Sequence, residues 1–261
     1  MSKTDLFRDL HHGDEPLLMP NSWDIGSAKI LQHLGFRALA TTSSGLAAAH
    51  GLLDGDLGAD ATLAHCVELV AAVDVPVSAD LENCYADDPA AVADVIGRAV
   101  AAGLAGASVE DWSGGGIYDR GLAAERVQAA VESANGALVI TARAENHVRG
   151  VDDLDDTIGR LQAFQEAGAD VLFAPGLGTA EQIREVVASV DLPVNVLVRP
   201  GVPSLAELAE LGVRRLSVGG AFAFTAYDAL VGAASEFHAG RAHGYLDAAA
   251  RGSAAIRAAL G

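Results

Sequence analysis

The sequence is poor in cysteine, in lysine and in long apolar runs, and each shortage excludes a class of protein. Its 261 residues include two cysteines, Cys66 and Cys84, too few and too far apart for a disulfide framework or a zinc site. The only lysines are Lys3 and Lys29, and neither is well placed for a Schiff base. No apolar run approaches the roughly 20 residues that a membrane span requires. We therefore expect a cytoplasmic protein with reduced thiols.

Basic residues are also scarce. Seventeen Lys and Arg residues against 35 Asp and Glu residues give a formal net charge of −18. Such an acidic surface repels phosphate backbones and anionic lipids, so we expect neither a nucleic acid nor a membrane as partner. Hydrophobic residues nevertheless make up 51% of the chain, enough to bury a large core. No segment reads as a linker, which favours a single domain over residues 1–261.

A weak internal repeat organises the chain. Segments beginning at Leu34, Ala102, Ala167 and Leu211 share a plan in which a helix ends at a glycine and a short apolar strand follows. Other apolar strands are expected at 16–20, 74–77, 135–140 and 191–197. Helical patterns fill the gaps at 24–34, 60–73, 89–102, 123–134, 152–167, 179–189, 204–211 and 221–236. Eight alternations predict an α/β protein, a (β/α)8 TIM barrel with its core at about 16–236; a doubly wound open sheet is the alternative.

The alanine-rich segment 237–261 exceeds what a minimal barrel requires. Its composition predicts a helical extension. Such an extension either covers the barrel or packs on another subunit, and the alanine content alone does not decide between these arrangements.

Charged side chains follow several predicted strands. Asp80 and Glu82 lie at the end of the apolar strand that includes residues 75–78, and residues two apart on a strand point to the same face, so we expect both carboxylates to face one space. Two further strands end in the pairs Glu110 with Asp111 and Arg143 with Glu145. Because the active sites of TIM barrels lie on loops that follow the strands, these side chains predict a site.

Carboxylates that converge without compensating lysines repel one another, so we expect a divalent cation among them. Oxygen ligands with few His or Cys residues nearby favour Mg²⁺ or Mn²⁺ over Zn²⁺. The alternative is that these acids cap helices or pair with arginines such as Arg143.

Other residues near strand ends have two interpretations each. Residues 41–45, Thr-Thr-Ser-Ser-Gly, offer hydroxyl and N–H groups to a substrate carboxylate, or form an ordinary βα turn with a helix cap. Arg143 can bind a carboxylate through two parallel hydrogen bonds, or it neutralises a neighbouring acid. The pair Gly219-Gly220 suits a phosphate or merely close packing. His147 is a candidate proton carrier or a solvated rim residue.

Motifs spread over residues 16–235 resemble the isocitrate lyase and phosphoenolpyruvate mutase superfamily. They occur in the order Pro20-Asn21-Ser22-Trp23-Asp24, Thr42-Ser43-Ser44-Gly45-Leu46, Val77-Ser78-Ala79-Asp80-Leu81-Glu82, Val109-Glu110-Asp111, Thr141-Ala142-Arg143-Ala144-Glu145-Asn146, Pro193-Val194-Asn195-Val196-Leu197 and Ser217-Val218-Gly219-Gly220-Ala221. The resemblance implies an α/β barrel that uses Mg²⁺ to hold a 2-oxo acid or an enolate-forming substrate. It also implies a homodimer or homotetramer whose subunits exchange a C-terminal helix, which the surplus segment 237–261 would supply.

The resemblance further implies a role for each motif residue. Asp80 resembles the superfamily residue that binds the metal directly, and Asp54, Glu82 and Glu110 resemble the acids that hold the waters of the metal. The expected substrate-binding residues are Thr41, Ser43, Ser44, Gly45, Arg143 and Asn195. The expected catalytic residues are Arg143, Glu110 and Tyr118, with Tyr118 or a metal-bound water as the proton source for an enolate.

Two loops depart from the superfamily pattern. The lyase branch carries a Cys-Gly-His motif after the fourth strand, whereas residues 112–120 here contain neither Cys nor His. Glycines that usually follow the third strand are replaced in Asn83-Cys84-Tyr85-Ala86, and residues with a Cβ adopt positive φ less readily, so this loop is expected to differ. Cys84 is expected to be a bystander. The glycines at 114–116 suggest a segment that closes over the site.

These observations predict a Mg²⁺-dependent lyase that makes or breaks a carbon–carbon bond beside a carbonyl in a small 2-oxo or 2-hydroxy dicarboxylate. Oxaloacetate decarboxylase and methylisocitrate lyase are the nearest activities that the resemblance offers. The alternatives are a carbon–phosphorus enzyme similar to phosphoenolpyruvate mutase and a catalytically silent barrel that binds 2-oxo acids. A phosphosugar isomerase or aldolase would instead need a phosphate at Gly219-Gly220.

Overall fold

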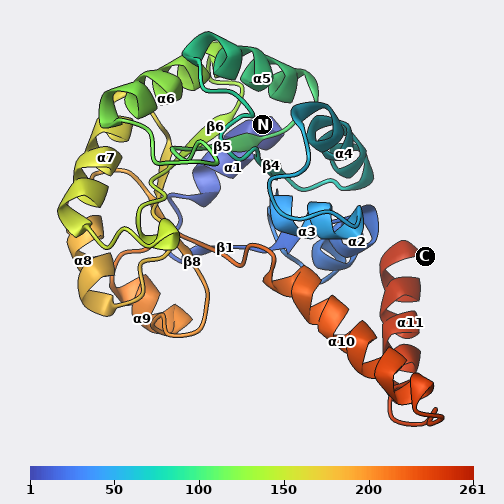
Figure 1. Ribbon diagram of the computed structural model, residues 1–261. Helices are drawn as coiled ribbons and strands as arrows, with labels where there is room; N and C mark the ends of the chain where they lie inside the picture. The colour runs from blue at the N-terminus through green and yellow to red at the C-terminus, as the bar shows by residue number, and fades with distance from the viewer.

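Short strands that alternate with helices form one parallel sheet in the computed structural model of residues 1–261 (Figure 1). The strands are β1 (Leu17–Met19), β2 (Asn21–Ser22), β3 (Leu39–Thr41), β4 (Val77–Asp80), β5 (Gly106–Glu110), β6 (Val139–Arg143), β7 (Val171–Phe173), β8 (Val194–Leu197) and β9 (Arg215–Ser217). Their order in the sheet is β1-β9-β8-β7-β6-β5-β4-β3-β2, and every neighbouring pair is parallel.

The sheet is a nearly closed barrel. Its two end strands, β1 and β2, are consecutive in the chain and are separated only by Pro20, which has no N–H to donate to a ladder. β1 pairs with β9 and β2 pairs with β3, so together they occupy the place of one strand. The predicted TIM barrel is confirmed, with its first strand divided in two.

Helices surround the strands, as Figure 1 shows. They are α2 (Ile25–His33), α4 (Ala59–Ala72), α5 (Pro89–Ala101), α6 (Arg120–Ala134), α7 (Leu154–Glu166), α8 (Ala180–Ala188) and α9 (Leu205–Glu210), whereas α10 (Ala221–His238) follows β9 and points away from the barrel. Side-chain caps begin most of them, because an Asp, Ser or Thr accepts a hydrogen bond from an otherwise unpaired N–H. Asp24 is one such cap: it accepts from Ser27 N at 2.6 Å and begins α2. Asp24 is therefore a helix cap here.

Two short helices lie outside the helical ranges predicted from the sequence, although a helix cap at residues 41–45 was one interpretation of that segment. α3 (Ser43–Ala49) follows β3, and α1 (Lys3–Leu10) precedes the barrel. Phe7 of α1 is fully buried and belongs to a cluster that includes Ala105 and Val139, which lie at or just before strand starts. α1 therefore covers the end of the barrel at which the strands begin. Its capping box between Ser2 and Asp5 was the available signal.

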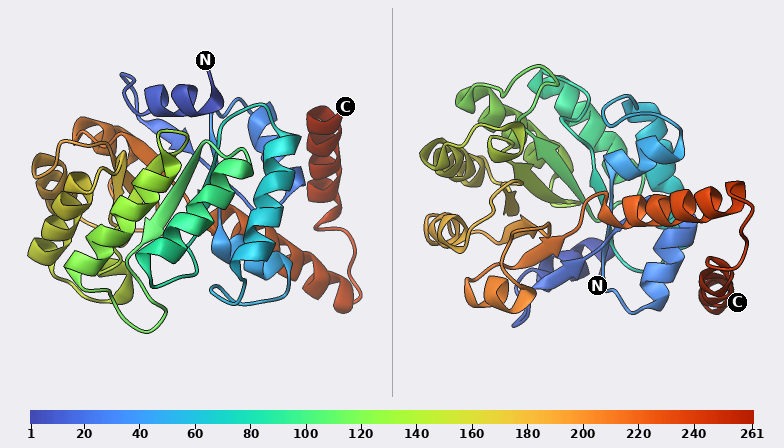
Figure 2. Two further views of the ribbon diagram at one scale, coloured as in Figure 1. Left: turned by 90° about the horizontal axis from the view of Figure 1, so that it is seen from above. Right: turned by 60° about the horizontal axis from the view of Figure 1, so that its bottom comes forward.

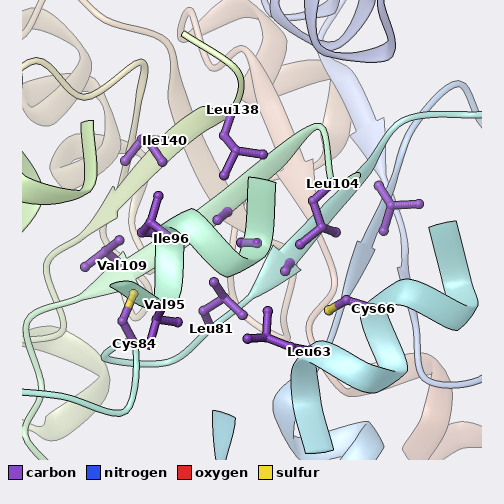
Figure 3. Packing of buried hydrophobic residues seen from close by; sticks show 14 of the residues in the cluster. Leu63, Cys66, Leu81, Cys84, Val95, Ile96, Leu104, Val109, Leu138 and Ile140 are labelled. Carbon is purple, nitrogen blue, oxygen red and sulfur yellow. The ribbon is translucent and has the colours of Figure 1, made fainter. Parts of the chain in front are cut away.

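The core lies between the sheet and its helices. Figure 3 shows one side of it, where Leu81, Ile96, Val109 and both cysteines belong to one cluster of buried residues. Cys66 and Cys84 are free and buried, and burial raises the pKa of each thiol to about 12. Both are therefore protonated packing residues, as expected for Cys84.

The C-terminal segment leaves the barrel. α10 projects outward and α11 (Leu246–Leu260) turns back to lie beside α2 (Figures 1 and 2). The predicted helical extension is confirmed. Ala223 is the one buried residue of α10, and large apolar side chains along both helices are exposed. None of the helices has the length and apolarity needed to cross a membrane.

Candidate active site

A cavity of about 220 Å³ opens where the strands end. It extends into the barrel interior as far as Arg215, the first residue of β9. A larger polar hollow of about 760 Å³ adjoins it and is lined by Glu82, Glu110 and Arg149. Ser43, Asp54 and Arg143 border both spaces. Strands and loops far apart in the chain therefore build one composite site at the predicted end of the barrel.

Asp80, the last residue of β4, connects three strands of this site. Its Oδ2 accepts hydrogen bonds from Ser43 N at 3.2 Å and Ser43 Oγ at 3.0 Å. Its Oδ1 accepts from Arg143 Nη1 at 2.8 Å and from Ser108 Oγ at 3.5 Å. Its own N–H donates to Thr41 Oγ1 at 2.8 Å. The carboxylate is thereby held in one orientation, facing the cavity.

Arg143, the last residue of β6, lies among three carboxylates. Its Nη1 is 2.8 Å from Asp80, and its Nη2 is 3.0 Å from Glu110 and 2.9 Å from Glu145. Burial opposes its charge, but these three acids outweigh burial and raise the pKa of the guanidinium. Arg149 adds a second cation, 3.4 Å from Glu145 and 3.8 Å from Glu110. The site is thus a dense network in which acids outnumber cations.

Two of the predicted acids are perturbed. Burial raises the pKa of Glu110 to about 8, although Arg143 acts against it. Burial, followed by the charges of Asp80 and Asp54, raises the pKa of Glu82 to about 7. Neither Glu82 nor Asp54 forms an ion pair, whereas Glu110 pairs with Arg143. Uncompensated negative charge therefore gathers on the side of the site that Glu82 and Asp54 border.

The prediction that strand alternation turns Asp80 and Glu82 toward one space is wrong: Asp80 lines the cavity and Glu82 lines the adjoining hollow. β4 ends at Asp80, and Glu82 has a φ of 51°, so strand alternation does not place the two side chains. Cys84 and Tyr85 also have positive φ, 58° and 55°, a region that residues with a Cβ rarely adopt. Three residues with a Cβ, Glu82, Cys84 and Tyr85, therefore adopt a backbone that glycine takes more easily, and these conformations are strained.

Residues 43–45 begin α3. Thr42 caps the helix by accepting from Gly45 N at 3.3 Å, while Ser43 is engaged with Asp80. A Cβ on Gly45 would lie 2.6 Å from Thr42 Cγ2, so only glycine fits there. A Cβ on Gly220 would lie 2.6 Å from Ser44 Oγ and 2.5 Å from the Phe224 ring, which favours close packing as the reason for that glycine.

Two asparagines tie the strand ends together. Asn21 donates to Thr41 O at 2.7 Å, and its Oδ1 accepts from the N–H groups of Val218 and Gly219. Asn195 is buried inside the barrel and lines the cavity. Its Nδ2 donates to Ser217 Oγ at 3.0 Å. Asn195 is thus in the site, with its amide already engaged.

Three candidates lie apart from this group. Tyr118 borders neither space, and its hydroxyl donates to Asp87. Asp111 accepts from Arg160 Nη1 at 3.0 Å and from a backbone N–H, so it is a structural partner. His147 is not a solvated rim residue: its ring is buried, with Nδ1 3.2 Å from Asp152.

Two arginines of the site were missed. Arg149 follows β6 within a short 3₁₀ turn, and its guanidinium lies 4.7 Å from the centre of the Trp112 ring. Arg215 lines the cavity from β9. Its signal was available, since Arg215 and Ser217 are polar residues two apart in an apolar strand and hence share its inward face.

The donor set fits a hydrated hard cation. No group of three or more His, Cys, Asp or Glu side chains lies close enough to hold a metal directly. Mg²⁺ usually keeps several waters and binds through one or two carboxylates. Asp80 offers one carboxylate to the cavity, Glu82 lines the adjoining hollow, and Asp54 borders both spaces; neither Glu82 nor Asp54 forms an ion pair. Carboxylate oxygens that bind a cation partly through its waters are the ligands that Mg²⁺ prefers.

Known proteins resemble the chain over most of its length. The sequence profile of phosphoenolpyruvate phosphomutase matches residues 7–238. An uncharacterized protein of Mycobacterium tuberculosis is 34% identical over 214 residues, which are 82% of this chain and 81% of that protein. A 2-methylisocitrate lyase of Halalkalibacterium halodurans is 26% identical over 226 residues, 83% of this chain and 71% of that enzyme. An oxaloacetate decarboxylase of Bradyrhizobium is 29% identical over 156 residues, 55% of this chain and 51% of that enzyme.

Solved structures share the fold. A candidate lyase/mutase of Burkholderia cenocepacia superposes with a TM-score of 0.88 at 47% identity, covering 90% of this chain and 87% of the other. A phosphonopyruvate hydrolase solved with oxalate and Mg²⁺ superposes with a TM-score of 0.85, covering 95% of this chain and 91% of the other; its 21% identity shows the fold alone. The chain therefore belongs to the phosphoenolpyruvate phosphomutase family, within the isocitrate lyase and phosphoenolpyruvate mutase superfamily that its motifs resemble.

Proposed function

We propose that this protein is a Mg²⁺-dependent lyase that cleaves or forms a carbon–carbon bond beside the carbonyl of a small 2-oxo or 2-hydroxy dicarboxylate. Relatives named 2-methylisocitrate lyase and oxaloacetate decarboxylase support a lyase-type reaction. The observation that carries the proposal is the position of Arg143 beside Asp80 at the open end of the barrel cavity. A fixed cation and a fixed carboxylate there suit an acid substrate and a hard metal ion.

The residues of the site divide into two groups. Asp80 would hold the cation, and Asp54, Glu82 and Glu110 would bind its waters. When bound, Mg²⁺ supplies Lewis-acid stabilisation of the negative oxygen that develops during cleavage. The proposed substrate-binding residues are Thr41, Ser43, Ser44, Gly45, Arg143 and Asn195.

A substrate carboxylate has to compete for Arg143 with the acids that already surround it. Asp80, Glu110 and Glu145 together occupy its Nη1, Nη2 and Nε groups. A weakly held monoanion would not displace them, whereas an acid with further contacts in the cavity would. A carboxylate fixed in this way would keep the scissile bond aligned with the π orbitals of the neighbouring carbonyl group.

Glu110 is the carboxyl group that we assign to proton transfer. It lies 3.0 Å from Arg143, which borders both spaces, and it lines the hollow beside the cavity mouth, so it can exchange a proton with a substrate bound at that mouth. Tyr118 is not assigned this step, because it borders neither space and its hydroxyl already donates to Asp87.

The site favours carbon–carbon over carbon–phosphorus chemistry. A phosphonate carries up to two negative charges, and it needs several cations in a compact cluster. At the mouth of the cavity, two arginines, Arg143 and Arg149, are already paired with three acids, Asp80, Glu110 and Glu145. Little positive charge there is left uncompensated for a phosphonate.

A panel of acids tests the proposal. The protein is incubated with oxaloacetate and with small 2-oxo and 2-hydroxy dicarboxylates, each with Mg²⁺ and with EDTA, and products are identified by mass spectrometry. Protein-free Mg²⁺ samples correct for spontaneous loss. We expect product from at least one dicarboxylate with Mg²⁺ only. Thermal stabilisation without any product would instead identify a catalytically silent binding protein.

We also propose that the protein forms a homodimer or homotetramer through its C-terminal helices. Phe222, Phe224 and Phe237 of α10 are exposed, the last at 68%, as are Leu246, Ile256 and Leu260 of α11. Exposed apolar surface of this extent marks an interaction surface. Light scattering after size exclusion tests it: a particle of one 26.6 kDa chain would contradict the assembly.

A further inference from the structure

Arg215 is a buried cation without a counter-ion. Only 3% of it is exposed, and no carboxylate lies within ion-pair distance. Its Nε donates to Asn195 Oδ1 at 3.0 Å, and its Nη1 donates to Thr141 Oγ1 at 3.0 Å. The same Nη1 lies 3.3 Å from His11 Nε2. Its Nη2 donates no hydrogen bond to the protein. The positive charge of a buried guanidinium whose partners are all neutral is not compensated by the protein, so an anion bound beside it is stabilised.

The other two buried arginines lie outside the cavity, and most of their N–H groups are bonded within the protein, although Nε of Arg126 has no partner. Arg160 pairs with Asp111 and Asp156. Arg126 has no carboxylate partner but donates to three backbone carbonyls, those of Glu110, Asn83 and Ala86, and lines neither the cavity nor the hollow. Arg215 differs from both because it lines the cavity and has an unused Nη2.

The charge of Arg215 persists at neutral pH. Burial, followed by the charge of Arg143, lowers its pKa to about 9, which still leaves the guanidinium protonated at pH 7. Burial and the charge of Arg215 lower the pKa of His11 to about 3, so its ring is neutral. Because His11 Nδ1 lies 2.7 Å from the carbonyl of Phe7 and donates to it, His11 Nε2 accepts from Arg215. His11 therefore adds no second charge at this position.

Arg215 lies deeper in the barrel than Arg143, by about two residues along the strand direction. It donates to Thr141, which precedes Arg143 by two residues on β6, and a two-residue step along a parallel strand is about 6.6 Å. Both arginines line the same cavity of about 220 Å³. The cavity thus has one cation at its mouth and one at its floor, spaced on the scale of a short diacid.

We infer that Arg215 binds the distal carboxylate of a dicarboxylate substrate whose first carboxylate is held at the mouth by Arg143. The inference rests on the proposed function and names the group that selects among its substrates. Nη2 of Arg215 donates a charge-assisted hydrogen bond to the distal carboxylate, while Asn195 and Thr141 hold the guanidinium in place. The site then prefers diacids to monoacids of equal length, because a monoacid leaves the buried cation unpaired.

Two matched pairs of acids test this preference. 2-Oxoglutarate and 2-oxopentanoate share five carbons and differ only in the distal carboxylate, and oxaloacetate and 2-oxobutyrate form the four-carbon pair. Dissociation constants with Mg²⁺ are measured by calorimetry at constant ionic strength. Since a buried charge-assisted pair is involved, we expect the better-fitting diacid to bind about 30-fold more tightly than its monoacid.

The variants Arg215→Met and Arg215→Lys assign the preference to this residue. In Arg215→Met we expect the ratio to fall below about 3-fold through loss of diacid affinity, with monoacid affinity nearly unchanged. Arg215→Lys keeps the charge and should retain part of the ratio, so it remains informative if the methionine variant does not fold. Arg126→Met is the matched control: it removes a buried arginine outside the cavity and should lower stability while keeping the ratio.

The outcomes separate this inference from the proposed lyase activity. An unchanged ratio in folded Arg215→Met, or equal affinities of both acids for the unaltered protein, overturns the role of Arg215 even if product forms. Selectivity that depends on Arg215 without any product supports the role and removes the lyase. Failure of every acid to bind overturns both.

Discussion

The mouth and the floor of the barrel cavity each present one arginine, in opposite surroundings. At the mouth, Arg143 is paired with Asp80, Glu110 and Glu145. At the floor, Arg215 is held by an amide, a hydroxyl and a neutral imidazole. The positive charge of Arg143 is compensated by the acids that it orients. The positive charge of Arg215 is not compensated within the protein and is available to a ligand. Chemistry is therefore expected at the mouth and discrimination at the floor.

The largest effect is expected from Asp80→Ala, which removes the central acid of the mouth. Ser43, Ser108 and Arg143 all lose their shared acceptor, and the proposed cation loses its ligand. We expect turnover to fall by about 10³-fold or more and Mg²⁺-dependent thermal stabilisation to vanish. Steady-state kinetics and a melting curve with Mg²⁺ measure both.

Asp60→Ala is the control for that variant. Asp60 forms an exposed ion pair with Arg98, which contributes little to stability. Parental rates are expected in Asp60→Ala. Parental rates in Asp80→Ala would remove the metal-site assignment.

Arg143→Lys sharpens the contrast at the mouth with a smaller change. An ammonium keeps the charge but cannot reproduce the planar fork that reaches Asp80 and Glu110 together. We expect kcat/KM to fall by about 100-fold while the chain stays folded. Arg98→Lys, at the exposed pair, provides the matched comparison. Kinetics equal to those of the unaltered protein would show that Arg143 does not bind the substrate carboxylate.

The floor predicts a pH dependence of stability through His11. Its pKa is lowered to about 3 in the folded protein from 6.5, so the unfolded chain binds a proton first as the pH falls. The contribution of His11 is complete above pH 6.5 and is lost progressively between pH 6.5 and 3. At pH 5.5 the loss is about 1 kcal/mol relative to neutral pH. Denaturant unfolding from pH 7.5 to 5 measures it, and His11→Gln should flatten that slope; an identical slope in this variant would contradict the neutral, buried ring.

Cys84→Ser is expected to have the smallest effect. The thiol is buried and protonated, and it touches neither the mouth nor the floor. Burying a hydroxyl there should cost about 1–2 kcal/mol of stability, with kcat changed less than about 2-fold. A collapse of kcat in a folded variant would give Cys84 a catalytic role.

The barrel was predictable because its signals are local and repeated. Helices ending at glycine caps, followed by short apolar strands, recur along the chain, and the predicted helix at 89–102 corresponds to α5 at Pro89–Ala101. The division of the first strand at Pro20 and the docking of α1 depend on contacts between distant segments. Such contacts leave only weak traces in a single sequence.

The site was predictable in composition but not in connectivity. Asp80, Glu110 and Arg143 were found because strand ends gather at one end of a barrel. That Arg143 would bind three acids at once depends on side-chain packing, which spacing does not encode. The left-handed backbone of Glu82 could not be anticipated, because the strand was taken to continue past Asp80. Arg215 was overlooked because it begins its strand, away from the charged strand ends.

The most direct test of the account is the rate of product formation from dicarboxylates in one sample carried through metal removal and return. The protein is assayed with Mg²⁺, then with EDTA, then with Mg²⁺ restored, beside Asp80→Ala and a protein-free blank. We predict turnover that disappears with EDTA, returns with Mg²⁺ and is absent from Asp80→Ala. Turnover that persists in EDTA, or that Asp80→Ala retains, would contradict a cation held by Asp80 beside Arg143.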